Sequence, residues 1–429
     1  MIYNGASGRE GVSMPSVLND PCHQAHAKPV WSRAWIRMGV WAAFVLMTST
    51  IVYNYLRLIL LSVPCLRPDG LEKTSFREWA NDNVPTSALA RWCGLDTAWT
   101  DFTKQVLVPL FSAVCTASEP DIMEHPVEEF LDYIWLTFGT HHYIVTSGVR
   151  DVVARLSANI PHIHLSSPIS AIRADTENPA LANILCATPD GIQTHAGFHH
   201  IVFGTQANAA VPILSSYLAS LPLKSAHRRR VERLGRTLAA FEYRPTIVIN
   251  HTDGSLMPDA ARDRRDLNLV CLDPRSAHPD PAALPDTCLP PSYTMATHVQ
   301  RPPPSYAHPE RLPTLYQTTN PIVAPRAETV LSVTRLERAV LTRAGKAALP
   351  GLYRAAGRRW WESAVEAAAR SGVGPLQGRG AGEPAVGVWV CGSYAYPGIP
   401  LLEGCVVSAQ NVARAIVALE SGSKGEGAA

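Results

Sequence analysis

Residues 388–416 read VWVCGSYAYPGIPLLEGCVVSAQNVARAI, and this stretch decides the fold. Its first residues combine β-branched and aromatic side chains with a closing glycine, which predicts a strand ending at Gly392. A turn rich in Gly and Pro follows, and from Pro400 or Leu401 onward small and apolar residues predict a helix. The stretch therefore predicts a strand, a tight turn and a helix in direct succession.

The junction between that strand and that helix is a candidate cofactor site. A strand that ends in glycine lets a ligand approach the backbone, and Gly404 allows the same approach in the first helical turn. Free amides at a helix N-terminus favour a ligand that carries negative charge, such as a reduced flavin around N1 and the C2 carbonyl. Five residues are expected to form the inward face of the helix: Val406, Ala409, Val412, Ala413 and Ile416. Taken alone, the pattern also fits a strand, turn and helix that only close an α/β layer.

A second block of α/β character lies upstream. Residues 148–156 predict a short helix, and residues 162–172, HIHLSSPISAI, predict a strand interrupted by a proline. The Asp-Gly pair at 190–191 predicts a hairpin between two further strands. Residues 199–214 then predict a strand that ends at Gly204 and continues into a helix.

The remainder of the chain divides into helical and β-rich parts. Residues 71–138 predict a compact helical cap, in which Ser75 and Glu78 have the spacing of a capping box. Residues 241–300 are rich in β-branched residues and predict strands separated by proline-rich loops. Residues 346–371 are rich in Ala and Arg and predict a helical stretch.

One apolar segment leaves a choice between core and membrane. Met38–Leu56 is uncharged between Arg37 and Arg57, and its nineteen residues approach the ~20 that cross a bilayer. Four polar residues interrupt it: Thr48, Ser49, Thr50 and Asn54. The arginines flank it symmetrically, so the positive-inside rule sets no orientation. Both a buried helix of the cap and a membrane segment fit this pattern.

Charge and cysteine usage limit the partners and the compartment. The chain has 38 basic and 36 acidic residues, a net charge of +2, which gives no electrostatic surface for nucleic acid. Nine cysteines without a C-x-x-C pair indicate small buried residues in a reducing, intracellular compartment. The histidine pairs, such as His162 and His164, lack further ligands at metal spacing and are interpreted as ordinary histidines, with no metal site.

Together, the closing stretch and the upstream block resemble the FAD-dependent amine-oxidase-like superfamily. In that family a strand, a Gly-acid pair and a G-x-x-x-E-G-A-V helix hold the isoalloxazine, as VWVCGSYAYPGIPLLEGCVV would here. The segment GVRDVVARL…HLSSPISAI…HHIVFGTQANAA is similar to the second FAD segment, where the adenine lies against a V-x-x-I strand that Ile169 and Ile172 match. The resemblance covers about Ser75 to Ile416 and implies FAD as the cofactor and a small molecule as the substrate.

The resemblance implies a set of cofactor-binding residues. On the second FAD segment these are Ile169 and Gly204. On the closing stretch they are Gly392, Ser393, Leu402, Glu403, Gly404, Cys405 and Val406. The resemblance does not assign a catalytic residue to any position of this sequence.

The sequence departs from the family at three places. No strand, G-x-G-x-x-G loop and helix for the pyrophosphate is present, and the dense glycines at 372–382 precede a strand instead of following one. Ser393 replaces the acid after the strand's glycine, and Leu401 replaces the aromatic that walls the amine pocket. An aromatic cage for an amine is therefore not expected.

The expected fold class is α/β with an α+β substrate domain, a truncated two-domain FAD-dependent amine-oxidase-like fold with an NAD(P)-binding-type domain. The expected division is a mobile tail at 1–33, an apolar helix at 34–62, a helical cap at 63–145, the second FAD-domain segment at 146–212, a β-rich, proline-rich substrate domain at 213–345 and the C-terminal FAD-domain segment with a tail at 346–429. Residues 146–212 and 384–418 are expected to meet in one α/β layer.

Two functions remain open at this point. The first is an FAD-dependent oxidoreductase of amine-oxidase-like type, in which the protein positions the flavin and excludes water. The second is a truncated, non-catalytic relative that acts as a binding module or attaches to a membrane through residues 38–56. The corresponding locations are the cytoplasm or a membrane surface.

Overall fold

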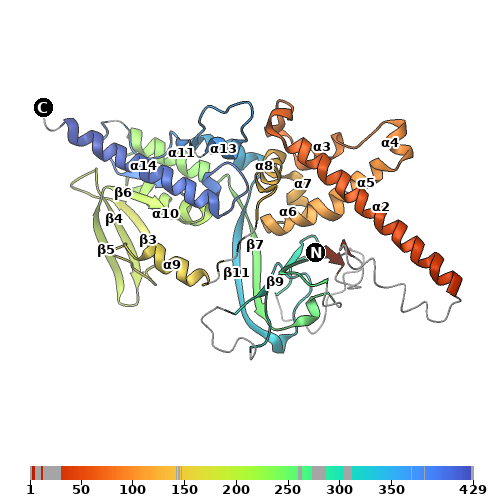
Figure 1. Cartoon of the computed structure of the whole chain (residues 1–429). Helices are drawn as coiled ribbons and strands as arrows, with labels where there is room; N and C mark the ends of the chain where they lie inside the picture. The colour runs from red at the N-terminus through yellow and green to blue at the C-terminus, as the bar shows by residue number, and fades with distance from the viewer. Residues whose placement is uncertain are drawn as a thin grey trace.

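The computed structural model describes residues 2–4, 11–12, 30–141, 143, 145, 147–258, 263–272, 287–302, 312–368, 370–380 and 382–426. Helices and strands are mixed, as expected for an α/β protein at a coarse level. A cap of helices lies at one end of the molecule and an α/β part at the other, and the long strands β7 and β11 run between them (Figure 1).

The cap consists of short helices packed around aromatic rings. Its elements are η3 (Pro64–Leu66), η4 (Leu71–Lys73), α3 (Phe76–Asp82), α4 (Ala88–Trp92), α5 (Leu95–Phe102), the π-helix η5 (Thr103–Leu107), α6 (Val108–Cys115), α7 (Glu119–Glu124) and α8 (Val127–Thr137). The capping box is confirmed, because the Ser75 hydroxyl accepts from the Glu78 amide and the Glu78 carboxylate accepts from the Ser75 amide. The rings of Phe111 and Phe130 stack with centroids 3.9 Å apart.

The apolar segment is part of a longer helix, α2 (Val30–Ser62), which begins four residues before the predicted boundary at 34. Its C-terminal half belongs to the cap core through Ile51, Leu58 and Leu61. The guanidinium of Arg57 lies 4.4 Å from the centroid of the Trp99 ring. The N-terminal half projects away from the cap (Figure 1).

A seven-stranded sheet lies beneath the cap, in the order β11-β7-β10-β9-β8-β1-β2. Its strands are β1 (Ile2–Asn4), β2 (Gly11–Val12), β7 (Glu242–His251), β8 (Leu267–Cys271), β9 (Met295–Gln300), β10 (Leu315–Thr319) and β11 (Val330–Val340). All neighbours pair antiparallel except β1 with β8. The prediction of a tail over 1–33 is wrong for residues 2–4 and 11–12, which form the last two strands at one side of the sheet, and for 30–33, which belong to α2. The rest of that segment lies outside the described residues.

The α/β part brings together segments that are far apart in the sequence. Its elements are α9 (Val149–Ser157), β3 (Ile169–Ala174), β4 (Ala182–Thr188), β5 (Gly191–Phe198), β6 (His200–Phe203), α10 (Ala207–Ser220), α11 (Ala226–Leu238), β14 (Gly387–Val390), η11 (Ser393–Ala395) and α14 (Leu402–Glu426). Strands β6 and β14 pair in parallel, so residues 146–212 and 384–418 do meet. Ile172, Phe203 and Val388 share one hydrophobic core.

Two predicted elements are wrong. Residues 162–168 form no strand; only Ile169–Ala174 pairs, with β4. The predicted helical stretch 346–371 is broken into α12 (Arg343–Ala348), η10 (Leu349–Gly351), β12 (Tyr353–Arg354) and α13 (Ala364–Ala368), and β13 (Gly372–Val373) pairs back onto β12. A proline and a glycine stop the helix after residue 348, because they disfavour continued helical hydrogen bonding.

The smaller 3₁₀ helices η6 (Gly254–Leu256) and η9 (Ala327–Thr329) lie at the ends of the long strands. Strand β11 was not predicted at all, although it makes a ten-position ladder with β7. Strands β7 and β11 lie at one side of the seven-stranded sheet and extend from it to the α/β part. The junction between β14 and α14 therefore lies near one end of the β7–β11 ladder (Figure 1).

Candidate functional site

The candidate site lies where the two parallel strands end side by side. The register pairs Val390 with Phe203, and the Cys391 amide donates to the Phe203 carbonyl over 2.9 Å. Gly204 and Gly392 therefore follow at the same edge of the sheet. In open α/β sheets, ligands bind outside the carboxyl ends of parallel strands.

The Ser408 hydroxyl of α14 forms hydrogen bonds with the backbone at this edge. Ser408 Oγ accepts from the Gly392 amide at 2.9 Å. It also lies 2.6 Å from the Gly404 carbonyl and 3.1 Å from the Gly392 carbonyl, which compete for its one proton. Ser408 is buried, and the sequence analysis did not select it, since a serine within a small-residue helix has no distinctive pattern.

The sequence predicts that a ligand approaches Gly404 closely, but in the structure the chain's own turn lies against this glycine. A Cβ at this position would lie 3.0 Å from the Ser393 carbonyl oxygen and 3.1 Å from Cδ1 of Tyr396. The backbone after β14 thus crosses directly over the first turn of α14. Any larger residue would force the turn and the helix apart.

This crossing sets which side of α14 faces inward. The predicted inward face is confirmed at Val412 and is wrong at most of its other positions. The buried residues are Gly404, Ser408, Asn411 and Val412, whereas the predicted Val406, Ala409 and Ala413 are exposed and Ile416 is half-buried. The choice was based on apolar character, but the helix turns its small and polar residues toward the strand because only they fit against the backbone there.

The tyrosines of the turn fill the interior and do not form an open cage. Tyr394 is buried, its hydroxyl donates to the Thr205 carbonyl over 3.1 Å, and burial raises the pKa of this phenol. Tyr396 is also buried, and burial followed by the nearby Glu403 carboxylate raises its pKa. Both phenols remain neutral hydrogen-bonding groups that brace the turn.

The structure brings some of the implied FAD residues together. Gly204, Gly392, Ser393 and Gly404 converge at the strand ends and the first turn of α14. The other α14 residues follow on that turn: Leu402, Glu403 and Val406 are exposed, and Cys405 is half-buried. Ile169 lies on β3, where it pairs with Cys186 of β4 and is 43% exposed.

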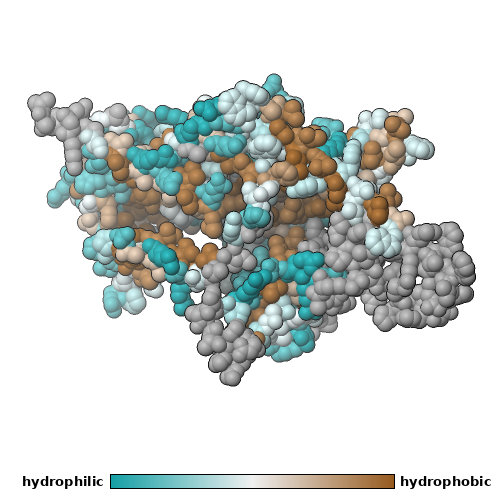
Figure 2. All heavy atoms as spheres, in the orientation of Figure 1, coloured by the Kyte–Doolittle hydropathy of each residue, from teal (hydrophilic) through white to brown (hydrophobic). Residues whose placement is uncertain are grey.

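The surface around this edge is apolar and uncovered. Within the described part of the chain, β6 pairs only with β14, so its other edge is open. Helix α9 buries no residue, and its apolar positions Val149, Val153 and Leu156 are each more than half exposed on one helical face. Figure 2 shows hydrophobic surface in a hollowed band between α14 and the strands below it.

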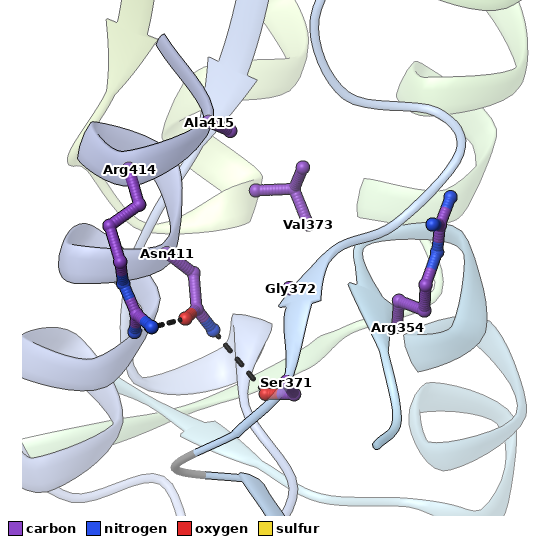
Figure 3. A pocket seen from close by; sticks show the side chains of 7 residues that line it. All are labelled: Arg354, Ser371, Gly372, Val373, Asn411, Arg414 and Ala415. Atoms are coloured by element: carbon purple, nitrogen blue, oxygen red, sulfur yellow. Dashed lines mark hydrogen bonds between the residues drawn. The ribbon is translucent and has the colours of Figure 1, made fainter. Parts of the chain in front are cut away.

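A polar hollow of about 320 Å³ lies on another side of α14 (Figure 3). Its lining residues are Arg354, Ser371, Gly372, Val373, Asn411, Arg414 and Ala415. Asn411 accepts from Arg414 at 2.8 Å and donates to the Ser371 hydroxyl at 3.4 Å. Ser371, Asn411 and Arg414 are hydrogen-bonded to one another. Arg354 and Arg414 lie on opposite sides of the hollow, so its described lining residues do not point free polar groups at one ligand position (Figure 3).

A buried carboxyl group with a raised pKa belongs to the cap. Lys346 Nζ lies 2.8 Å from Glu128 and 2.7 Å from Glu129, which joins α12 to α8. Burial raises the pKa of Glu129 to about 7, and its second oxygen has no partner. Because this cluster joins two elements and does not line the polar hollow, its role is structural, and the ion pair within it is the one between Lys346 and Glu128. Among the described residues no three potential metal ligands converge.

No protein-family model matches the chain, and no curated protein matches it. The assignment of function therefore rests on the geometry of the junction between β14 and α14.

Proposed function

We propose that the chain carries the flavin-facing part of an FAD site, in an FAD-dependent oxidoreductase of amine-oxidase-like type. The observation that supports this most is the parallel pair β6–β14, whose carboxyl ends carry Gly204 and Gly392 next to the N-terminus of α14. Parallel sheets are nearly always larger and covered on both faces. A pair with one open edge and uncovered apolar neighbours is therefore interpreted as part of a larger nucleotide-binding sheet.

The groups at the junction fit the pyrimidine end of a flavin. The strand end and the first turn of α14 pack closely, because a Cβ at Gly392 would lie 2.8 Å from the Tyr394 ring and one at Gly404 would lie 3.0 Å from the Ser393 carbonyl oxygen. The Gly404 amide donates to the Leu401 carbonyl, so the first-turn amides that the helix geometry leaves for a ligand are those of Leu402 and Glu403. Such amides and the helix dipole stabilise negative charge, which a reduced flavin carries around N1 and the C2 carbonyl. Gly392, Ser393, Glu403 and Gly404 would hold this end of the ring, and the bound flavin would supply the hydride chemistry.

The pyrophosphate end of FAD has no counterpart in the sequence. No G-x-G-x-x-G motif occurs in the chain, so there is no predicted loop whose amides could surround the phosphates. The proposal therefore requires that a separate βαβ unit lies against the open edge of β6. The uncovered faces of α9 and β6 are where such a unit would be placed.

Binding of flavin fragments tests the proposal. The quenching of flavin fluorescence is titrated with riboflavin and with FAD on the purified chain. Because only the ring has contacts in this chain, both ligands should bind weakly and with affinities within about tenfold of each other. Absence of saturable quenching by either ligand would remove the basis for a flavin site.

A second candidate function is attachment to a membrane, and α2 favours it. Two helices of the described chain are long and apolar enough to cross a membrane, Val45–Ser62 in α2 and Leu402–Ser421 in α14. The end of α2 is fixed in the cap by Leu58 and Arg57, so the projecting half is the part free to enter a lipid surface. That half exposes Val45 and Leu46 (54% and 70%), which a lipid surface would cover.

A further inference from the structure

A hollow of about 440 Å³ lies between α2 and the α5–η5 segment of the cap. Its lining from α2 is Leu46, Met47, Thr50, Ile51 and Asn54, and its lining from the other side is Gly94, Thr97, Ala98, Asp101, Phe102, Gln105 and Val106. The volume is within the range of small-molecule sites, roughly 300–1,000 Å³. The hollow is far from the β14–α14 junction in the fold (Figure 1).

One polar atom in this lining has no partner. Asn54 is fully buried, and its Nδ2 donates to the Ala98 carbonyl over 3.3 Å, while its Oδ1 has no hydrogen bond. Turning the amide over would place its oxygen against that carbonyl, so the unpartnered atom is an acceptor in the favourable orientation. A buried acceptor without a donor costs free energy that a ligand's donor would recover.

The remaining lining shows what kind of molecule fits. The Thr50 hydroxyl is used within the helix, because it donates to the Leu46 carbonyl over 2.8 Å. From Asn54 the α2 side of the hollow continues through Ile51 and Met47 to Leu46, about 12 Å along the helix. The α2 wall is therefore an apolar path with one acceptor at its inner end, and the facing wall adds the polar residues Thr97, Asp101 and Gln105.

The opposite wall contains an irregular helix. The Val108 amide donates to the Thr103 carbonyl, which makes residues Thr103–Leu107 a π-helical turn within the α5–α6 segment. Such turns are rare and are frequently found at functional sites. Here the turn supplies Gln105 and Val106 to the hollow.

We propose that this hollow binds a single-chain amphiphile, with its hydrogen-bond donor on Asn54 and its alkyl chain along Ile51, Met47 and Leu46. A medium-chain alcohol has the required shape and the single donor. The site is independent of the flavin proposal, since its lining residues share nothing with the junction.

The test compares two ligands that differ in one donor. Binding of 1-decanol and of methyl decyl ether to the full-length chain is measured by isothermal titration. The alcohol should bind about tenfold more tightly, because only it can donate to Asn54. Asn54→Leu should still bind both ligands but lose this preference, and it should melt no lower than the parent chain because it removes an unsatisfied buried group.

Two matched Phe variants test whether the ligand binds in the hollow. Thr50→Phe fills the hollow and should weaken binding of the alcohol by at least about tenfold. Ser49→Phe adds the same ring at the neighbouring exposed position, which does not line the hollow, and should leave the affinity unchanged. The proposal is overturned if alcohol and ether bind equally to the parent chain. It is also overturned if the two Phe variants weaken binding alike, which would indicate adsorption to the exposed surface of α2.

Discussion

Ser408 Oγ lies 2.9 Å from the amide nitrogen of Gly392 and accepts its hydrogen bond across sixteen residues of sequence. This bond joins the end of β14 to the second turn of α14. It holds the turn that carries Ser393, Tyr394 and Tyr396 against α14, and so fixes how Gly392 and Ser393 of the proposed flavin site lie relative to Gly404.

Removing the Ser408 hydroxyl is therefore expected to loosen the junction. Ser408→Ala leaves the half-buried Gly392 amide without its acceptor, which should lower the free energy of unfolding by about 1–3 kcal/mol. Denaturant titration measures this change. Ser421→Ala, in the same helix but exposed and bonded only to Val417 O, is the control and should have no measurable effect. Equal stability of both variants would show that the bond does not hold the junction.

Two glycine substitutions should have opposite effects. Gly404→Ala places a Cβ 3.0 Å from the Ser393 carbonyl oxygen, and the backbone there cannot move without displacing β14, so a loss of about 1–3 kcal/mol is expected. Gly235→Ala, in α11, meets nothing closer than 3.7 Å, from Leu214, and should gain about 0.5–1 kcal/mol through higher helix propensity. Thermal melting shows whether each variant is less or more stable than the parent chain. A gain at both positions would contradict the close crossing at Gly404.

The buried Glu129 should make stability depend on pH. Burial raises its pKa from 4.5 to about 7, so the folded state holds a proton that the unfolded state releases. The contribution of the protonated Glu129 carboxyl to the free energy of unfolding is fully present below pH 4.5. It is lost as the pH rises toward 7, and the total loss is on the order of 3 kcal/mol. The unfolding free energy of the parent chain should thus fall over this window relative to Glu129→Gln.

The control for this pH effect is Glu124→Gln. Glu124 also pairs with basic side chains, Arg77 and Arg343, but all three side chains are about half exposed. Its replacement should leave the slope of stability against pH unchanged. If the parent chain and Glu129→Gln have parallel pH profiles, Glu129 is ionised throughout and the Lys346 pair outweighs burial.

The membrane proposal predicts flotation with neutral phosphatidylcholine vesicles. Val45→Glu combined with Val52→Glu adds charge to the exposed face of α2 and should abolish flotation, because charge in the acyl region is costly. Leu223→Glu, at a position that is 82% exposed outside any helix, is the control and should float like the parent. Failure of the parent chain itself to float would exclude attachment through α2.

The sequence was sufficient where local chemistry decides the structure. The glycine and proline residues around Gly392 mark the end of β14 and the start of α14, and Asp190-Gly191 marks the β4–β5 hairpin; all are present. These signals work because a positive φ or a missing amide restricts the backbone within a few residues.

The failures come from contacts that are distant in sequence. Strand β11 is exposed along most of its length, so it shows no alternation of apolar and polar residues that would indicate a strand. Residues 162–168 have such a pattern but form no strand, since no neighbouring strand pairs with them among the described residues. The stretch after residue 348 has helical composition, but Glu362 is instead held by Arg370 at 2.7 Å, which stabilises a loop. Ser408 and the inward face of α14 depend on the crossing at Gly404, which local sequence does not specify.

The measurement that tests the central proposal most directly is the FAD content of two purified proteins, the 429-residue chain and the same chain joined to a βαβ unit with a G-x-G-x-x-G loop. Each charge-assisted hydrogen bond to the pyrophosphate contributes on the order of 1.5–3 kcal/mol, so without the loop the affinity should be lower by many orders of magnitude. We expect the chain alone to be colourless with FAD far below stoichiometric, and the joined protein to be yellow with one FAD bound per chain. Stoichiometric FAD in the chain alone would show that another segment contacts the phosphates, and a colourless joined protein would show that the β14–α14 junction is not a flavin site.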